Sequence, residues 1–125
     1  MRFRSLVGGG GMAAALALST AATPVRRHTQ LVKSQPAAHD TLTTAPTQLS
    51  LWYSERLELR VSTFKLVGPK GAVALGPATN DVKQKSAPIL IPITGAIEHG
   101  RYDVQWNVSA DDGHPVKGTF FFVVK

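Results

Sequence analysis

The alternation of apolar and polar residues predicts a chain made mainly of β-strands. Residues 47–54 and 101–108 alternate with a period of two, which is typical of strands that turn one face to a core and the other to water. Residues 118–125 are almost continuously apolar, which predicts a closing strand buried on both faces. The inward residues expected from the two alternating segments are Leu49, Leu51, Tyr53, Tyr102, Val104, Trp106 and Val108.

Weaker strand patterns fill most of the remaining chain. They are separated by glycine and proline turn signals, and no segment has a sustained helical period. About seven short strands predict an all-β fold, an Ig-like Greek-key β-sandwich that has no disulfide because the chain has no cysteine. The weaker strands are expected at 30–34, 58–67, 72–75 and 88–93.

The first residues have the layout of an export signal. Arg2 and Arg4 precede a stretch without charge from 5 to 25, whose apolar part, 12–18, is followed by small residues. Four consecutive glycines make the segment a poor membrane anchor. We expect a signal peptide over 1–21, with cleavage after Ala21 or Ala22, or as late as residue 27 if a second protease trims after two arginines. The mature domain is then 28–125.

The composition excludes several classes of function. Without cysteine there is no thiolate zinc site, iron–sulfur cluster or cysteine nucleophile. The formal charge of +6 falls when the signal is removed, because Arg2 and Arg4 are lost, leaving 12 basic residues against 8 acidic ones. Neither a basic stripe nor interleaved aromatic residues remain, so we expect no binding of nucleic acid.

One turn contains residues suited to metal chemistry. In 109–115, between two strongly predicted strands, Asp112 and His114 are two residues apart, so their side chains converge if the backbone is extended. A carboxylate and an imidazole together suit Cu(II), Ni(II) or Zn(II). The alternative is an ordinary turn, because Asp-Asp-Gly is common turn chemistry.

Enzymatic sites are less well supported by the sequence. No Gly-x-Ser-x-Gly motif is present, which argues against a serine hydrolase. Glu55 and Glu58 fit a solvated strand end better than a pair of glycosidase carboxylates. Trp52 and Trp106 alternate with Leu and Val, so both are expected in the core. We therefore expect a protein that is not an enzyme.

Taken together, five segments resemble the CopC family of periplasmic copper-resistance proteins. They lie in order and span nearly the whole mature chain: 28–38, 42–46, 49–55, 100–106 and 109–118. The resemblance implies an Ig-like Greek-key sandwich that carries one Cu(II) per chain in the periplasm. It implies three ligands: His28, through its ring and amino group, Asp112 and His114.

The same resemblance implies the surroundings of the copper ion. Glu55 corresponds to a supporting acid close to the ligands, and Asp111 either orients His114 or replaces Asp112 as ligand. His39 and His99 match no ligand position, so we expect both to be surface turn residues. The only methionines, Met1 and Met12, lie in the presumed signal, so we expect no thioether site for Cu(I). The family further implies a monomer that hands copper to an inner-membrane CopD-like transporter.

Two other functions remain as alternatives. A copper-dependent oxidase is one, because an N-terminal histidine that chelates copper also occurs in lytic polysaccharide monooxygenases. A structural Ig-like module without metal is the other. It gains weight if cleavage after Ala21 or Ala22 leaves His28 internal, because its amine is then a peptide nitrogen.

Overall fold

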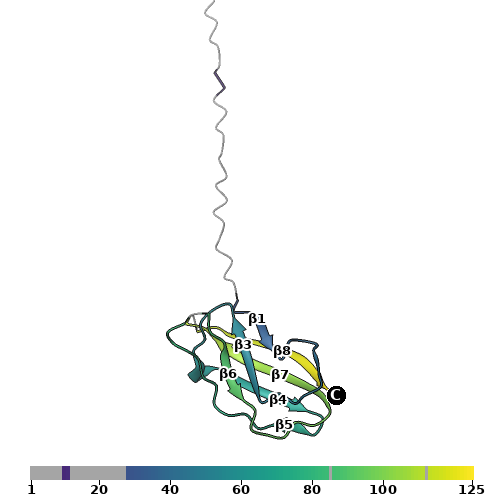
Figure 1. Cartoon of the computed structure of the whole chain (residues 1–125). Coiled ribbons are helices and arrows are strands. Elements are labelled where there is room, and N and C mark those ends of the chain that lie inside the picture. Colours follow the sequence, from purple (N-terminus) through teal and green to yellow (C-terminus); the bar gives the residue numbers. More distant parts are fainter. Residues whose placement is uncertain (1–9, 12–27, 85, 112) are drawn as a thin grey trace, which may run out of the picture.

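Two β-sheets pack face to face to form a sandwich (Figure 1). The computed structural model describes residues 10–11, 28–84, 86–111 and 113–125. No helix of these residues is long and apolar enough to cross a membrane. The elements are β1 (Leu31–Gln35), β2 (Thr41–Leu42), β3 (Gln48–Tyr53), a 3₁₀ turn η1 (Leu59–Val61), β4 (Thr63–Gly68), β5 (Gly71–Val73), β6 (Ile89–Pro92), β7 (Gly100–Ser109) and β8 (Pro115–Val124).

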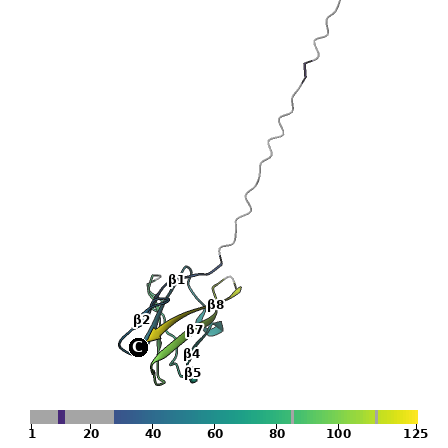
Figure 2. The ribbon, with the colours of Figure 1, turned by 90° about the vertical axis from the view of Figure 1, so that its right-hand side faces the viewer.

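The chain passes between the sheets several times, as expected for Greek-key connections. The smaller sheet has the order β1-β3-β6 and the larger one β2-β8-β7-β4-β5. All pairs are antiparallel except β2 with β8. In Figure 2 the C-terminus lies beside β2, in agreement with the pairing of Leu42 with Val124. The predicted fold class, a β-sandwich without disulfide, is confirmed.

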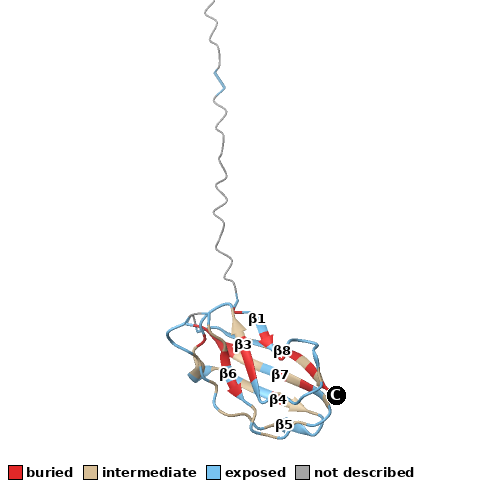
Figure 3. Ribbon diagram, in the orientation of Figure 1, coloured by how far each residue is buried: buried red, intermediate tan, exposed pale blue. Residues whose placement is uncertain are grey.

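The core lies between the two sheets. Figure 3 shows buried residues concentrated along β3, β6, β7 and β8. Tyr102 stacks on Phe122 with ring centroids 5.5 Å apart, and Trp106 packs against the edge of the same cluster. All seven residues predicted to face inward belong to this core or pack against it. The fully buried side chains are Leu49, Leu51, Leu66, Ile91, Tyr102, Val104, Val108 and Phe122.

The structure corrects three details of the prediction. The segment 58–67 is not one strand, because η1 precedes β4. The two-residue β2 was not predicted. The closing strand β8 is not buried on both faces: Phe120, Phe122 and Val124 are buried, whereas the residues between them are exposed or half-buried. On this outer face, Phe121 is covered by the ring of His39 and the guanidinium of Arg101.

Trp52 is also placed differently from the prediction. It does not belong to the core cluster, and the Nζ atom of Lys33 lies 4.7 Å from the centroid of its ring. Because Leu51 points into the core, alternation along β3 turns Trp52 to the opposite face of the sheet. The expectation of core packing is therefore right for Trp106 and wrong for Trp52.

Candidate metal centre

Three chain segments that are distant in sequence meet at one end of the sandwich. They are residues 28–30 before β1, residues 54–58 after β3, and the loop 110–114 between β7 and β8. The antiparallel pairing places the start of β1 against the end of β3, since Leu31 is opposite Tyr53. Four of the five predicted site residues lie on these segments and are described by the structure: His28, Glu55, Asp111 and His114.

The first segment is held by hydrogen bonds to the end of β3. The backbone N–H of Ser54 donates to the carbonyl of Gln30 over 2.8 Å, and the N–H of Gln30 donates to Oγ of Ser54 over 2.8 Å. Thr29 is 5% exposed, and its Oγ1 donates to Oε2 of Glu55 over 3.1 Å. His28, one residue earlier, is exposed. The anchored Thr29 and Gln30 therefore fix the point from which His28 extends.

The loop between β7 and β8 begins where the regular pairing ends, at Ser109 opposite Pro115. The N–H of Gly113 donates to the carbonyl of Ala110 over 3.0 Å, and Gly113 has a φ of 77°, a conformation that costs glycine little. Asp111 and His114 are exposed. Asp112 lies outside the described residues.

The third segment connects the other two. Leu57 forms an isolated antiparallel bridge with Ala110, and the N–H of Glu58 donates to the carbonyl of Ser109 over 2.8 Å. Ser54 and Glu55, which directly follow β3, bind the N-terminal segment, and Leu57 and Glu58 bind the loop. Both predicted ligand-bearing segments are attached to one short stretch of backbone.

The predicted ligand set stays a prediction. The described residues contain no group of three or more potential metal-binding side chains. His28, Glu55, Asp111 and His114 lie on the three segments that meet at this end, and all four are exposed. Thr29 was not predicted to take part. The available signal was a small hydroxyl residue directly after His28, which is too common a feature to be singled out.

The two remaining histidines lie elsewhere, as predicted. His39 is an exposed turn residue with a φ of 65°, and its ring centroid is 4.6 Å from that of Phe121. His99 is exposed directly before β7, at the end of that strand opposite to the loop 110–114. Neither histidine can therefore complete the predicted site.

An aromatic pair lies directly behind the site. Tyr53 and Trp106 are in an edge-to-face arrangement, with centroids 6.0 Å apart and an interplanar angle of 79°. The hydroxyl of Tyr53 is buried and has no hydrogen-bond partner among the described residues. Burial raises the pKa of this phenol well above its ordinary value. The phenol of Tyr53, two residues before Glu55, is therefore uncharged at neutral pH.

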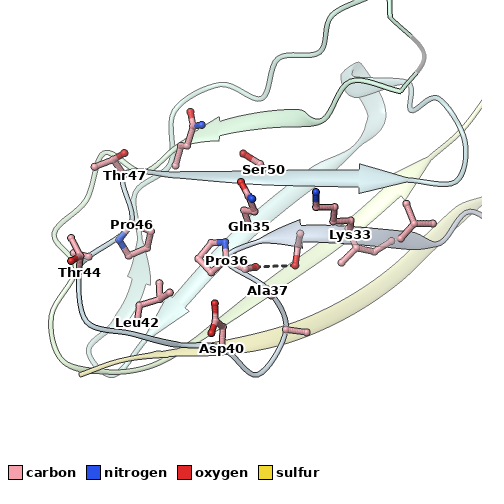
Figure 4. Close-up of a pocket in the computed structure, with 16 residues that line it drawn as sticks. Lys33, Gln35, Pro36, Ala37, Asp40, Leu42, Thr44, Pro46, Thr47 and Ser50 are labelled. Carbon is pink, nitrogen blue, oxygen red and sulfur yellow. Dashed lines mark hydrogen bonds between the residues drawn. The ribbon is translucent and has the colours of Figure 1, made fainter.

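A large hollow of the described residues lies away from the three segments. It has a volume of about 1040 Å³ and lies between β1 and the segment 40–48 (Figure 4). Its lining includes Lys33, Pro36 and Asp40, and the hydroxyl of Ser34 donates to the carbonyl of Pro36 over 2.8 Å. No histidine lines it, so it does not offer the imidazole nitrogen expected of a copper site.

Comparison with known proteins gives a consistent result. The model of the CopC domain family matches residues 31–125. Protein YobA of Escherichia coli K12 is 34% identical over 115 residues, covering 90% of this chain and 92% of YobA. Copper resistance protein C of Escherichia coli is 33% identical over 125 residues, covering 93% of this chain and 92% of that protein.

The fold agrees with a solved structure as well. The crystal structure of CopC from Methylosinus trichosporium OB3b superposes with a TM-score of 0.69 at 25% sequence identity, covering 78% of this chain and 94% of that one. The chain therefore belongs to the CopC family of copper-resistance proteins.

Proposed function

We propose that this protein binds one Cu(II) ion outside the cytoplasm and carries or sequesters it. The ligands in this proposal are His28, Asp112 and His114, supported by the carboxylates of Glu55 and Asp111. The proposal starts from the family, whose members are copper-binding resistance proteins and not enzymes. The chain therefore has a copper-related function and is not an enzyme, which excludes a copper-dependent oxidase.

The observation that carries the proposal is the attachment of both ligand-bearing segments to residues 54–58. Gln30 is bonded to Ser54, and Ser109 is bonded to Glu58, each through backbone atoms over 2.8 Å. This arrangement supports a site in which ligands from the two ends of the mature chain are held on one frame. A pre-formed frame lowers the ordering entropy that a metal ion must offset when it binds.

The proposed donor set suits Cu(II). Two imidazoles, a carboxylate and an amine form the tetragonal nitrogen and oxygen environment that this ion prefers. The hydrogen bond from Thr29 to Glu55 keeps that carboxylate beside the start of the mature chain, where its charge stabilises a bound cation. The methionines, Met1 and Met12, both belong to the proposed signal, so the mature chain has no thioether for Cu(I).

Processing decides whether the amine is available. We propose an export signal over 1–21, which directs the protein to the periplasm, and a copper-binding domain over 28–125. Cleavage after Ala21 or Ala22 leaves His28 internal, with only its ring as donor. Trimming to residue 27 would expose the α-amine of His28, which closes a chelate ring with the imidazole of the same residue. In the periplasm we propose that a monomer passes the ion to an inner-membrane CopD-like transporter.

A pair of histidine variants tests the site. We expect His114→Ala to lower the affinity for Cu(II) by about 100-fold or more, because an imidazole ligand is lost. His99→Ala is the matched control, since it removes an exposed histidine from the other end of β7. Competition titration with a Cu(II) chelator measures both, and circular dichroism checks the fold. Stoichiometric binding by His114→Ala with unchanged affinity would show that the assigned site is wrong.

Native mass spectrometry of the exported protein tests the processing. A mass that begins at His28 and increases by one copper ion supports the complete amine, imidazole and carboxylate site. A mass that begins at Ala22 or Thr23 and retains no copper would contradict the copper-carrier proposal. The domain would then be a structural Ig-like module.

A further inference from the structure

The outer face of the larger sheet carries an array of polar side chains on three neighbouring strands. Register pairs Lys65 of β4 with Gln105 of β7, and Gln105 with Thr119 of β8. A second row, two residues along each strand, pairs Thr63, Asn107 and Lys117 in the same way. Because alternate residues share a face, all six side chains point away from the core.

This array surrounds a shallow hollow. The hollow has a volume of about 520 Å³, and all six polar residues line it, together with Trp106 and Gly118. Five of the six are exposed, and Asn107 is half-buried. The hollow therefore lies over three paired strands, β4, β7 and β8, of the larger sheet.

None of the six side chains uses its hydrogen-bonding capacity within the described chain. None of them takes part in a side-chain hydrogen bond or an ion pair with another described residue, and the buried Oδ1 of Asn107 has no partner there. The other strand cations differ in this respect: Lys33 lies over the ring of Trp52, and Arg101 lies over Phe121. Lys65 and Lys117 are thus the two strand cations without a partner among the described residues.

No carboxylate lines the hollow. The nearest acid along β7 is Asp103, two residues from Gln105, and its Oδ1 is bonded to the guanidinium of Arg101 over 3.2 Å. The charge of Asp103 is therefore compensated. Two ammonium groups facing a concave surface with no acid in it produce a local positive potential.

We propose that this hollow is a binding site for a phosphate group. The ammonium groups of Lys65 and Lys117 would form charge-assisted hydrogen bonds with the phosphate oxygens. The hydroxyls of Thr63 and Thr119 and the amide of Gln105 would donate further bonds. Asn107 is held by no hydrogen bond of the described chain, so its amide can present either its NH₂ group to phosphate or its oxygen to a neighbouring hydroxyl.

A phosphate group can reach the protein in two forms. One is a soluble phosphate or phosphate ester, and the other is the headgroup of a phospholipid at a membrane surface. The exposed large apolar side chains of the described residues, Val32, Val61, Val82 and Leu90, do not line the hollow, so the proposed binding requires no insertion into the acyl region. The residues that line the hollow include none of the proposed copper ligands.

The test uses two variants of the full mature chain with the same net charge. Lys65→Gln/Lys117→Gln removes both ammonium groups from the hollow. Lys83→Gln/Lys125→Gln is the matched control, since it removes two lysines that lie outside the hollow. Each protein is titrated with inorganic phosphate and with glycerol phosphate, followed by backbone amide shifts in NMR. Each is also sedimented with vesicles of phosphatidylglycerol or of phosphatidylcholine at about 100 mM salt, where long-range attraction is screened.

We expect shifts confined to β4, β7 and β8 in the parent and the control, and a loss of binding of about tenfold or more in Lys65→Gln/Lys117→Gln. Binding of soluble phosphate without vesicle binding assigns the site to free phosphate, and selective sedimentation with phosphatidylglycerol assigns it to a headgroup. If both variants lose the same amount of affinity, the loss is an effect of net charge and the proposal is wrong. The proposal is also wrong if the parent protein binds none of the probes. Cu(II) titration of each variant checks the fold independently.

Discussion

The contact between Trp106 and Gly118 makes Gly118→Ala a sharp test of the packing. These residues are directly opposite in the pairing of β7 with β8. A Cβ atom added at Gly118 would lie 2.2 Å from Cζ2 of Trp106, 2.4 Å from Cε2 and 2.6 Å from Nε1. All three separations are far below van der Waals contact, so the indole ring must move. It cannot move freely, because it packs against Tyr53 and Phe120.

The magnitude follows from two opposing effects. Overpacking a well-filled core costs about 1–3 kcal/mol. Replacing glycine by alanine within a strand returns about 0.5–1 kcal/mol, because the unfolded chain loses conformational freedom. Because all three separations are far below contact, we place the overpacking cost at about 2–3 kcal/mol. The net destabilisation is then about 1–2.5 kcal/mol, equivalent to a fall in Tm of roughly 4–20 °C for a domain of this size.

Urea and thermal unfolding followed by tryptophan fluorescence measure this effect. Thr119→Ala is the control: it changes the adjacent, exposed residue and should alter the free energy of unfolding by less than about 0.5 kcal/mol. In a Trp106→Phe background, Gly118→Ala should cost less, since the indole atoms that clash are gone. An unchanged or raised Tm for Gly118→Ala alone would refute the packing described here.

Three further predictions concern the surroundings of the proposed copper site. Tyr53→Phe should leave the free energy of unfolding unchanged or raise it by about 1 kcal/mol, because the buried hydroxyl has no partner among the described residues. Burial raises the pKa of Tyr53 above its ordinary value of 10.0, so the phenol ionises in the unfolded chain before it ionises in the folded one. The free energy of unfolding therefore falls as the pH rises above 10.0, and urea unfolding at several pH values should show a smaller fall for Tyr53→Phe. Thr29→Val removes the hydroxyl that binds Glu55 and should weaken Cu(II) binding about tenfold, whereas Thr29→Ser keeps the hydroxyl and should not. If Thr29→Val and the parent protein have equal affinities for Cu(II) in a chelator competition, Thr29 does not position Glu55 for copper binding. Acidification from pH 8 to pH 5 should release Cu(II), since amine and imidazole ligands must be unprotonated; retention at pH 5 in dialysis would point to a site of carboxylates only.

Much of the fold could be predicted because strand periodicity reports burial directly. β7 was predicted well: its inward residues alternate without interruption from Tyr102 to Val108, and the strand lies in the middle of the larger sheet. β8 was predicted to be buried on both faces because Phe121 is as apolar as its neighbours. In the structure His39 and Arg101 cover that ring, and a contact between residues so distant in sequence leaves no local pattern.

The short elements were missed for a different physical reason. β2 has only two residues and owes its conformation to pairing with the end of β8, a tertiary contact. η1 interrupts a segment whose residues have good strand propensity. The hydroxyl of Ser62 accepts a hydrogen bond from the N–H of Ser109 and donates one to the carbonyl of Glu58, which favours a turn there.

The candidate site shows the same division between local and tertiary information. Asp112 and His114 could be identified as a pair because they are two residues apart in the same predicted turn. Thr29 could not, because its relation to Glu55 spans 26 residues and depends on the pairing of β1 with β3. His28 was assigned only through resemblance to a family, since a lone histidine near a chain end carries no spacing signal of its own.

The geometry of the sandwich also explains why the N-terminus matters so much for the proposed copper site. Thr29 is buried and Gln30 is bonded to Ser54 by two hydrogen bonds, so the chain is fixed one residue after His28. Whatever precedes His28 must leave from this anchored point beside the loop 110–114. A chain that continues toward residue 22 would replace a chelating amine by a poorly basic peptide nitrogen. Proteolytic trimming would therefore act as the step that completes the metal site, and copper affinity should increase when the chain is made to begin at His28.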